Sequence, residues 1–150
     1  WDLSKSVLVD KSPPNLMRTR LLRGLFPECK IVAMTRHPIA VALATHRSWG
    51  VSVEEALRHW CLCHEIFALD TGGNTSRWLY TARYEDFVDP RVFPRLSKSL
   101  LRFLGLNRHQ SLLTTRQDEN ERAFDTWRAE KHSYPELADR VTRFGYSLKV

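Results

Sequence analysis

Two short apolar runs, each followed by a cation, a proline and an amphipathic stretch, constrain the fold more than any other feature. Residues 6–9 and 31–34 are continuous and rich in β-branched side chains, as in parallel strands covered on both faces. Prolines then end each run, because proline removes a ladder donor and favours a helix start. The order strand, helix, strand, helix within about 45 residues predicts a βαβα unit of a parallel α/β sheet.

The rest of the chain continues this alternation. We find no internal repeat and no second domain, so residues 1–150 are predicted to form one α/β domain. Its expected architecture is a three-layer sandwich, with a central parallel sheet flanked by helices. A third strand is expected over residues 78–82, turns or loops over 70–76 and 114–120, and helices over 16–25, 39–49, 53–69, 92–104, 121–130 and 135–144.

Composition excludes several classes of protein. No apolar run approaches the ~20 residues that span a bilayer, and three cysteines do not make a disulfide framework. The chain carries 23 Lys and Arg against 17 Asp and Glu, a net charge of +6, which favours anionic partners. Because these cations are spread along the chain rather than clustered, the sequence argues against nucleic acid as the partner.

A cation follows each apolar run at the point where the predicted strand ends. Ligands of parallel sheets bind outside the carboxyl ends of the strands, and a cation beside the free amides of a helix N-terminus forms an anion site there. Arg36 occupies such a place, and its planar fork suits a phosphate; Lys11 repeats the arrangement after the first run. The sequence thus predicts a shared anion pocket, although strand-end cations are often only solvated. The glycines form neither GxxxxGK nor GxGxxG.

The residues around these cations resemble the sulfotransferases that use 3′-phosphoadenosine 5′-phosphosulfate (PAPS), and the Golgi carbohydrate and tyrosylprotein branch more than the cytosolic one. Each motif is weak alone, but their order and spacing are specific. The resemblance is carried by VLVDKSP at 7–13, LFP at 25–27, KIV at 30–32, TRHPIAVAL at 35–43, YEDF at 84–87, FLGL at 103–106, Asn120-Glu121, Phe124, Trp127 and FGY at 144–146.

This resemblance implies roles for particular residues. Arg36 would bind the 3′-phosphate of PAPS, Lys11 would face the sulfuryl group or the acceptor, and Tyr84 would pack near the adenine. The implied fold is the P-loop-like sulfotransferase fold, and the implied reaction is sulfuryl transfer from PAPS to a hydroxyl or amine of a carbohydrate, protein or other acceptor, without a metal. A membrane would be involved only through segments outside this chain. The compartment would be the Golgi lumen in a eukaryote and the cytoplasm in a bacterium.

The sequence also departs from the family pattern. The serine expected eight residues after the arginine is Ala44, and Thr45 or Ser48 is left to compensate, with Thr45 favoured. The histidine that serves the cytosolic branch as base is Pro13, so the base is not identified. The N-terminal loop that holds the 5′-phosphosulfate is expected to be missing here, which makes the fold incomplete and the chain alone inactive.

Two alternative functions stay open. The first alternative is a sulfotransferase-like module that binds a nucleotide or a protein but catalyses no reaction; Ala44 and the expected loss of the loop favour it. The second is a basic nucleic-acid-binding domain, which only the net charge favours.

Two further motifs carry weaker hypotheses. His59 and Cys63 share a helical face, as in some zinc sites, but no remote ligand pair is evident and a packed helix face is the favoured interpretation. The segment 74–76 is an N-glycosylation sequon.

Overall fold

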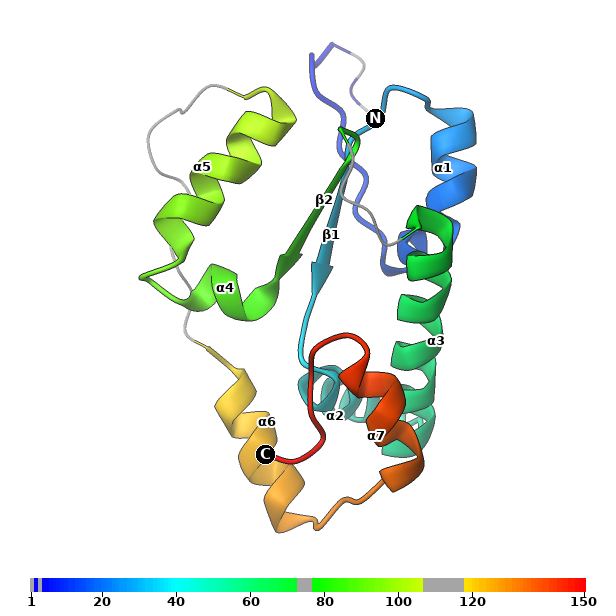
Figure 1. Ribbon diagram of the computed structural model, residues 1–150, viewed down its shortest axis with the longest axis vertical. Helices are drawn as coiled ribbons and strands as arrows, with labels where there is room; N and C mark the ends of the chain where they lie inside the picture. The colour runs from blue at the N-terminus through cyan, green and yellow to red at the C-terminus, as the bar shows by residue number, and fades with distance from the viewer. Residues whose placement is uncertain (1, 3, 73–76, 107–117) are drawn as a thin grey trace.

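A computed structural model describes residues 2, 4–72, 77–106 and 118–150 of the chain (Figure 1). The predicted helices and the two later strands are confirmed, with ends that differ by a residue or two for most of them. In chain order the elements are η1 (Pro13–Arg18, a short 3-10 helix), α1 (Thr19–Leu25), β1 (Ile31–Thr35), α2 (Pro38–Trp49), α3 (Val53–Thr71), β2 (Leu79–Arg83), α4 (Tyr84–Val88), α5 (Phe93–Leu104), α6 (Asn120–Ala129) and α7 (Pro135–Thr142).

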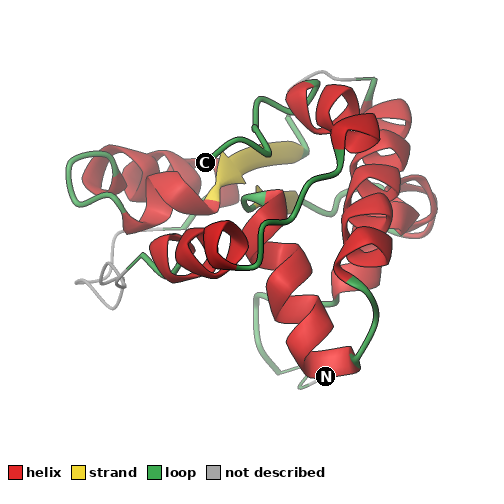
Figure 2. Cartoon of the chain, turned by 90° about the horizontal axis from the view of Figure 1, so that it is seen from below, coloured by secondary structure: helices red, strands yellow, loops and turns green. Residues whose placement is uncertain are grey.

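The two strands form a parallel pair in which Ile31 lies opposite Leu79 and Thr35 opposite Arg83. Their carboxyl ends therefore meet at one edge of the sheet. Figure 1 shows α4 and α5 on one side of the strands and α1 and α3 on the other, and Figure 2 shows helices on both sides of the strands. The α/β class is thus confirmed, but the sheet of the described residues has two strands, so the complete three-layer sandwich is not shown.

The strand predicted over residues 6–9 is wrong for this structure. Val7, Leu8 and Val9 lie in extended chain outside any strand, with 52%, 43% and 76% of their surface exposed. A β-branched run favours a strand only where a neighbouring strand supplies hydrogen bonds, and among the described residues β1 pairs with β2 alone. Lys11 consequently does not follow a strand.

Helix α3 is the longest element, and local signals set both of its ends. Ser52 caps the N-terminus in a reciprocal capping box with Glu55, and Gly72 ends the helix in the left-handed region at φ 64°. One face of α3 is mostly apolar and packs inward. Its buried members are Ala56, Leu57, Trp60, Cys61, His64 and Phe67.

The main core lies beyond the carboxyl end of β1, between α2 and its neighbouring helices. Ile39 and Leu43 of α2 pack with Leu57 of α3, Trp127 of α6 and Leu137 of α7. Each of these side chains is at most 5% exposed, and burying one stabilises the fold by about 1.5–3 kcal/mol. This packing holds the start of α2 close to the strand ends.

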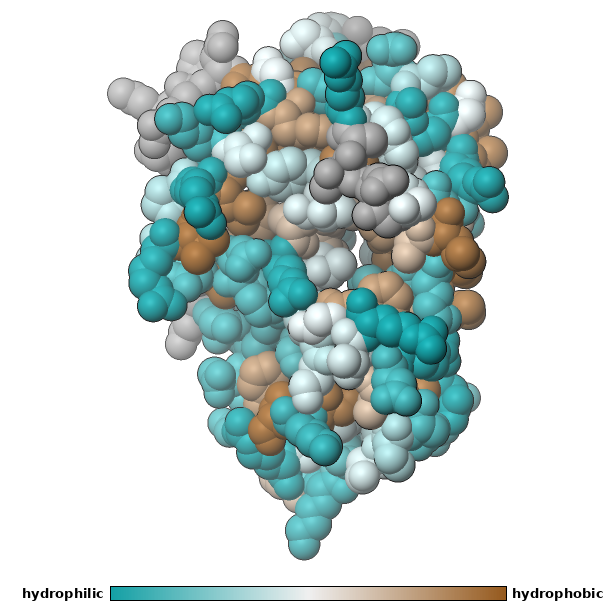
Figure 3. All heavy atoms as spheres, viewed as in Figure 1, coloured by the Kyte–Doolittle hydropathy of each residue, from teal (hydrophilic) through white to brown (hydrophobic). Residues whose placement is uncertain are grey.

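Apolar side chains remain on the surface as well. Val32 and Met34 of β1 are 39% and 50% exposed, on the strand face opposite to Ala33. In the space-filling view, apolar and hydrophilic patches alternate, and the surface is hollowed between the sheet and α3 (Figure 3).

His64 lies buried in an aromatic cluster. Its ring stacks on Trp60 at 3.9 Å, and Nδ1 lies 2.8 Å from the Trp60 carbonyl oxygen. Within the described residues, Nε2 of His64 and Nδ1 of His37 are buried without a hydrogen-bond partner. Burial lowers the pKa of both imidazoles below the ordinary value of 6.5, although the carbonyl of Trp60 and the carboxylate of Glu85, respectively, act in the opposite direction.

Stability is therefore expected to fall on mild acidification. In the unfolded chain these histidines become protonated as the pH drops through about 6.5, whereas in the folded chain they resist protonation. The free energy of unfolding is therefore unaffected by protonation of these two histidines above that pH and declines below it. We expect the free energy of unfolding, measured with urea, to fall between pH 7.5 and 5.5, because folding keeps both histidines neutral. His64→Leu should lose less stability over this interval; an equal loss in both proteins would contradict the assignment.

Candidate functional site

Arg36 lies in the two-residue link between β1 and α2. Its backbone is held because the indole N–H of Trp60 donates to the Arg36 carbonyl at 3.2 Å. Its side chain has two contacts from different elements: Cζ lies 4.3 Å from the centroid of the Tyr84 ring, and Nε donates to Oδ1 of Asn120 at 2.9 Å. A cation–π contact and a hydrogen bond thus present a half-buried guanidinium at the sheet edge.

Glu85, the second residue of α4, joins the surrounding segments. Its Oε1 accepts from the backbone N–H of His37 at 2.9 Å and from Nδ2 of Asn120 at 2.7 Å. Its Oε2 accepts from the hydroxyl of Tyr146 at 3.0 Å. One carboxylate therefore connects the ends of both strands with α6 and with the C-terminal segment.

This arrangement changes the predicted anion site in one respect. A helix N-terminus attracts negative charge, and at α2 the Glu85 carboxylate already takes the His37 amide. The residue left to meet an outside anion is therefore Arg36 rather than this amide.

Tyr146 reaches the site because the chain reverses after α7. Gly145 adopts φ 74°, which suits glycine, and a Cβ at this position would collide with the Arg83 guanidinium. The Tyr146 hydroxyl also lies 3.3 Å from Oγ1 of Thr35. Burial, reinforced by the nearby Glu85 carboxylate, raises the pKa of Tyr146 to about 12, so the phenol keeps its proton and donates to Glu85.

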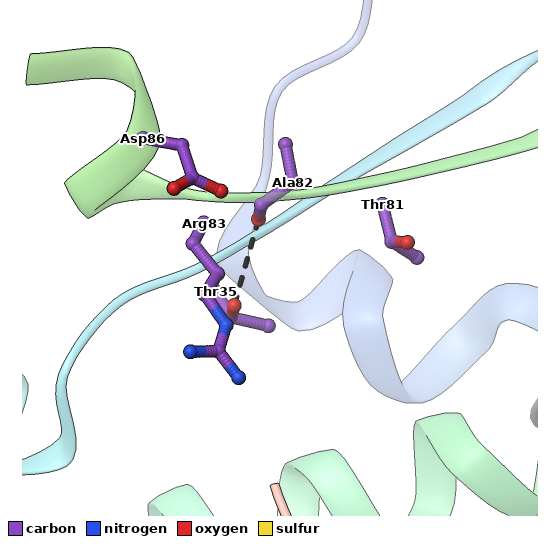
Figure 4. A pocket seen from close by; sticks show the side chains of 5 residues that line it. All are labelled: Thr35, Thr81, Ala82, Arg83 and Asp86. Atoms are coloured by element: carbon purple, nitrogen blue, oxygen red, sulfur yellow. Dashed lines mark hydrogen bonds between the residues drawn. The ribbon is translucent and has the colours of Figure 1, made fainter. Parts of the chain in front are cut away.

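An open hollow lies beside these residues at the ends of the strands (Figure 4). Arg83 contributes a cation to its wall, and its guanidinium lies 4.9 Å from the centroid of the Tyr146 ring. The hydroxyl of Thr35 lies 3.5 Å from the carbonyl of Ala82. The hollow is lined by Thr35, Thr81, Ala82, Arg83 and Asp86.

The structure brings some of the predicted site residues together. Arg36 and Tyr84 are in contact. Lys11 is exposed, and none of the hydrogen bonds or ion pairs among the described residues involves it. Thr45 is half-buried within α2, and Ser48 is exposed near the end of that helix; neither side chain forms a hydrogen bond within the described part of the chain.

The sequence prediction assigned no role to Glu85, Asn120 or Tyr146, although all three lie in the motifs that carry the resemblance. Glu85 had one local signal, because a carboxylate directly after a strand lies at the ligand-binding edge. Asn120 and Tyr146 had none, since only tertiary packing brings them to the strands.

The weaker motifs add little to the site. Sγ of Cys63 lies 3.4 Å from Nε2 of His59, but within the described ranges no group of three or more His, Cys, Asp and Glu side chains is placed to hold a metal ion. Burial raises the pKa of the Cys61 and Cys63 thiols. The sequon at 74–76 is outside the described residues. No described helix combines the length and apolar character needed to cross a membrane.

The fold and site define an α/β protein with a cationic edge at the carboxyl ends of parallel strands, an arrangement suited to anionic ligands. The sequence profile of the sulfotransferase family matches residues 2–111, and the chain belongs to this family. The resemblance seen in the sequence is thereby confirmed at the family level, and the family indicates sulfuryl transfer in general. No curated protein and no solved structure matches the chain.

Proposed function

We propose that this chain binds the 3′-phosphate of PAPS at Arg36 and serves in sulfuryl transfer from PAPS to an acceptor hydroxyl or amine. The supporting observation is the guanidinium of Arg36, held at the sheet edge by Tyr84 and Asn120. Within the described residues, neither Nη atom of Arg36 forms a hydrogen bond, so both are available to grip a phosphate as a fork.

The contact between Arg36 and Tyr84 also limits how an adenine is bound. One face of the Tyr84 ring is covered by the guanidinium. An adenine that packs on this tyrosine therefore uses the opposite face or the ring edge.

The transfer step itself is in-line. The acceptor oxygen or nitrogen forms a bond to sulfur while the bond from sulfur to the bridging oxygen of PAPS breaks; adenosine 3′,5′-bisphosphate leaves, and the acceptor proton passes to a base or to solvent. No metal is required, because cations that meet the charge on the transferring group supply the electrostatic stabilisation. Lys11 is the proposed cation of this kind, while Thr45 is the proposed second ligand of the 3′-phosphate.

Thermal unfolding with added nucleotide tests the proposal. A ligand that binds only the folded state stabilises it by about 2.7 kcal/mol at 100 times Kd. We expect adenosine 3′,5′-bisphosphate to raise Tm more than adenosine 5′-phosphate does at equal concentration. Equal shifts, or no shift at saturating concentration, would contradict a 3′-phosphate site.

Transfer and nucleic-acid binding are measured separately. In an intact protein that includes the loop for the 5′-phosphosulfate, movement of label from PAPS to a hydroxyl or amine acceptor supports the enzyme, whereas nucleotide binding without transfer supports the non-catalytic module. Tight, steeply salt-dependent binding of duplex or single-stranded DNA, without a nucleotide effect, would support the nucleic-acid alternative.

In an intact enzyme that includes the loop for the 5′-phosphosulfate, replacing Lys11 with methionine is expected to slow transfer by about 100-fold, as the loss of one preorganised charge-stabilising group does. The Kd of adenosine 3′,5′-bisphosphate should change by less than about twofold, because this product lacks the sulfuryl group. Lys5→Met is the matched control, since Lys5 is an exposed lysine paired with Asp2. A transfer rate that falls equally in both variants would argue against a role for Lys11.

A further inference from the structure

Asn120 is buried at the first turn of α6, where it touches both Arg36 and Glu85. Only 1% of its surface is exposed. Its Oδ1 accepts from Nε of Arg36 at 2.9 Å, its Nδ2 donates to Oε1 of Glu85 at 2.7 Å, and its backbone N–H donates to Asp118 at 2.9 Å. The amide is therefore fixed at its carbonyl end, at its amino end and at its backbone.

The two contacts of Arg36 constrain different degrees of freedom. The cation–π contact places Cζ of Arg36 4.3 Å from the centroid of the Tyr84 ring but leaves the guanidinium free to turn about this position. The hydrogen bond from Nε to Asn120 removes this remaining rotation. With Nε engaged, the guanidinium presents its Nη1 and Nη2 end to a ligand.

We infer that Asn120 is a positioning residue that aims the Arg36 fork at the 3′-phosphate and thereby sets the preference for a 3′-phosphorylated nucleotide. The inference rests on the proposed function. Asn120 lies outside residues 2–111, the part of the chain that matches the sulfotransferase family. The segment that begins at residue 118 thus contributes to a site whose cation comes from the matched part.

Glu85 helps to hold Asn120 in place. Because it accepts from Asn120 and from the His37 backbone, it ties the amide of Asn120 to the start of α2, next to Arg36. Thr19 offers a matched control outside this network, because it is also 1% exposed and its hydroxyl donates to the carbonyl of Leu16 at 3.1 Å. Thr19→Ala removes a buried hydrogen bond without touching Arg36, Asn120 or Glu85, and it serves as the control.

The experiment compares two dissociation constants, those of adenosine 3′,5′-bisphosphate and adenosine 5′-phosphate, by titration calorimetry on the whole chain. We expect Asn120→Ala to lower the preference for the bisphosphate about tenfold while the Kd of adenosine 5′-phosphate changes by less than about twofold. If Asn120 had only a structural role, its substitution would weaken the binding of both nucleotides equally. Thr19→Ala should lower stability but keep the preference.

Asn120→Asp keeps the shape of the side chain and provides a second test. Its carboxylate still accepts from Arg36 but neutralises the guanidinium and faces Glu85 without a donor, so the preference should fall at least as far as in Asn120→Ala. In the Arg36→Ala background, Asn120→Ala should lower the preference no further, since the two residues act as a unit.

The possible failures are distinguishable. A wild-type chain that binds both nucleotides equally would overturn the proposed function, and the role of Asn120 with it. A selective wild type whose preference survives in Asn120→Ala and Asn120→Asp would overturn the positioning role alone. So would a tenfold loss on Asn120→Ala that persists in the Arg36→Ala background.

Discussion

Arg36→Ala is expected to weaken the binding of adenosine 3′,5′-bisphosphate about 100-fold, or about 2.7 kcal/mol. The substitution removes a fork of charge-assisted N–H donors from the 3′-phosphate. Adenosine 5′-phosphate should bind with nearly unchanged affinity, because it has no group for this fork. Titration calorimetry with both nucleotides gives the ratio directly.

Two further arginine variants sharpen this prediction. Arg91→Ala removes the same charge from an exposed guanidinium that pairs with Asp89, so it should leave the ratio unchanged. Arg36→Lys keeps the charge but loses the fork and the Nε donor, so we expect an intermediate loss. If Arg91→Ala weakened binding as much as Arg36→Ala, the nucleotide would be responding to net charge rather than to a site.

Glu85→Ala is expected to lower the free energy of unfolding by about 3 kcal/mol. The Glu85 carboxylate accepts from the His37 amide, from Asn120 and from Tyr146, and Asn120 and Tyr146 are 1% and 8% exposed. Leaving a buried donor without a partner costs about 1–3 kcal/mol for each group. Urea unfolding followed by circular dichroism measures the loss.

Glu85→Gln separates hydrogen bonding from packing. The amide oxygen still accepts from two donors, and its NH2 group can donate to the Tyr146 hydroxyl, so we expect a loss of only about 1 kcal/mol. Glu85→Asp, one methylene shorter, should lose more than this. Equal losses in the alanine and glutamine variants would mean that the hydrogen bonds around Glu85 do not stabilise the fold.

Prediction of the fold from the sequence succeeded where the signal was local and failed where it was not. The capping box at Ser52 and the left-handed glycine at position 72 set the ends of α3 within one segment of sequence. Helix α4 is too short for a hydrophobic period to reveal it. The run at 7–9 has the composition of a strand, but strand formation depends on a neighbour that sequence patterns do not supply.

The same distinction between local and long-range signals applies to the site. By itself, the sequence determined that a cation, Arg36, follows a strand and precedes a helix, and that Tyr84 follows the next strand, because both facts depend on adjacent residues. Only the tertiary structure decided that Tyr84 contacts the Arg36 guanidinium and that Asn120 and Tyr146 meet at Glu85. These contacts join residues that are far apart in the chain, and the side chains come together only after the helices have buried their apolar faces in the core.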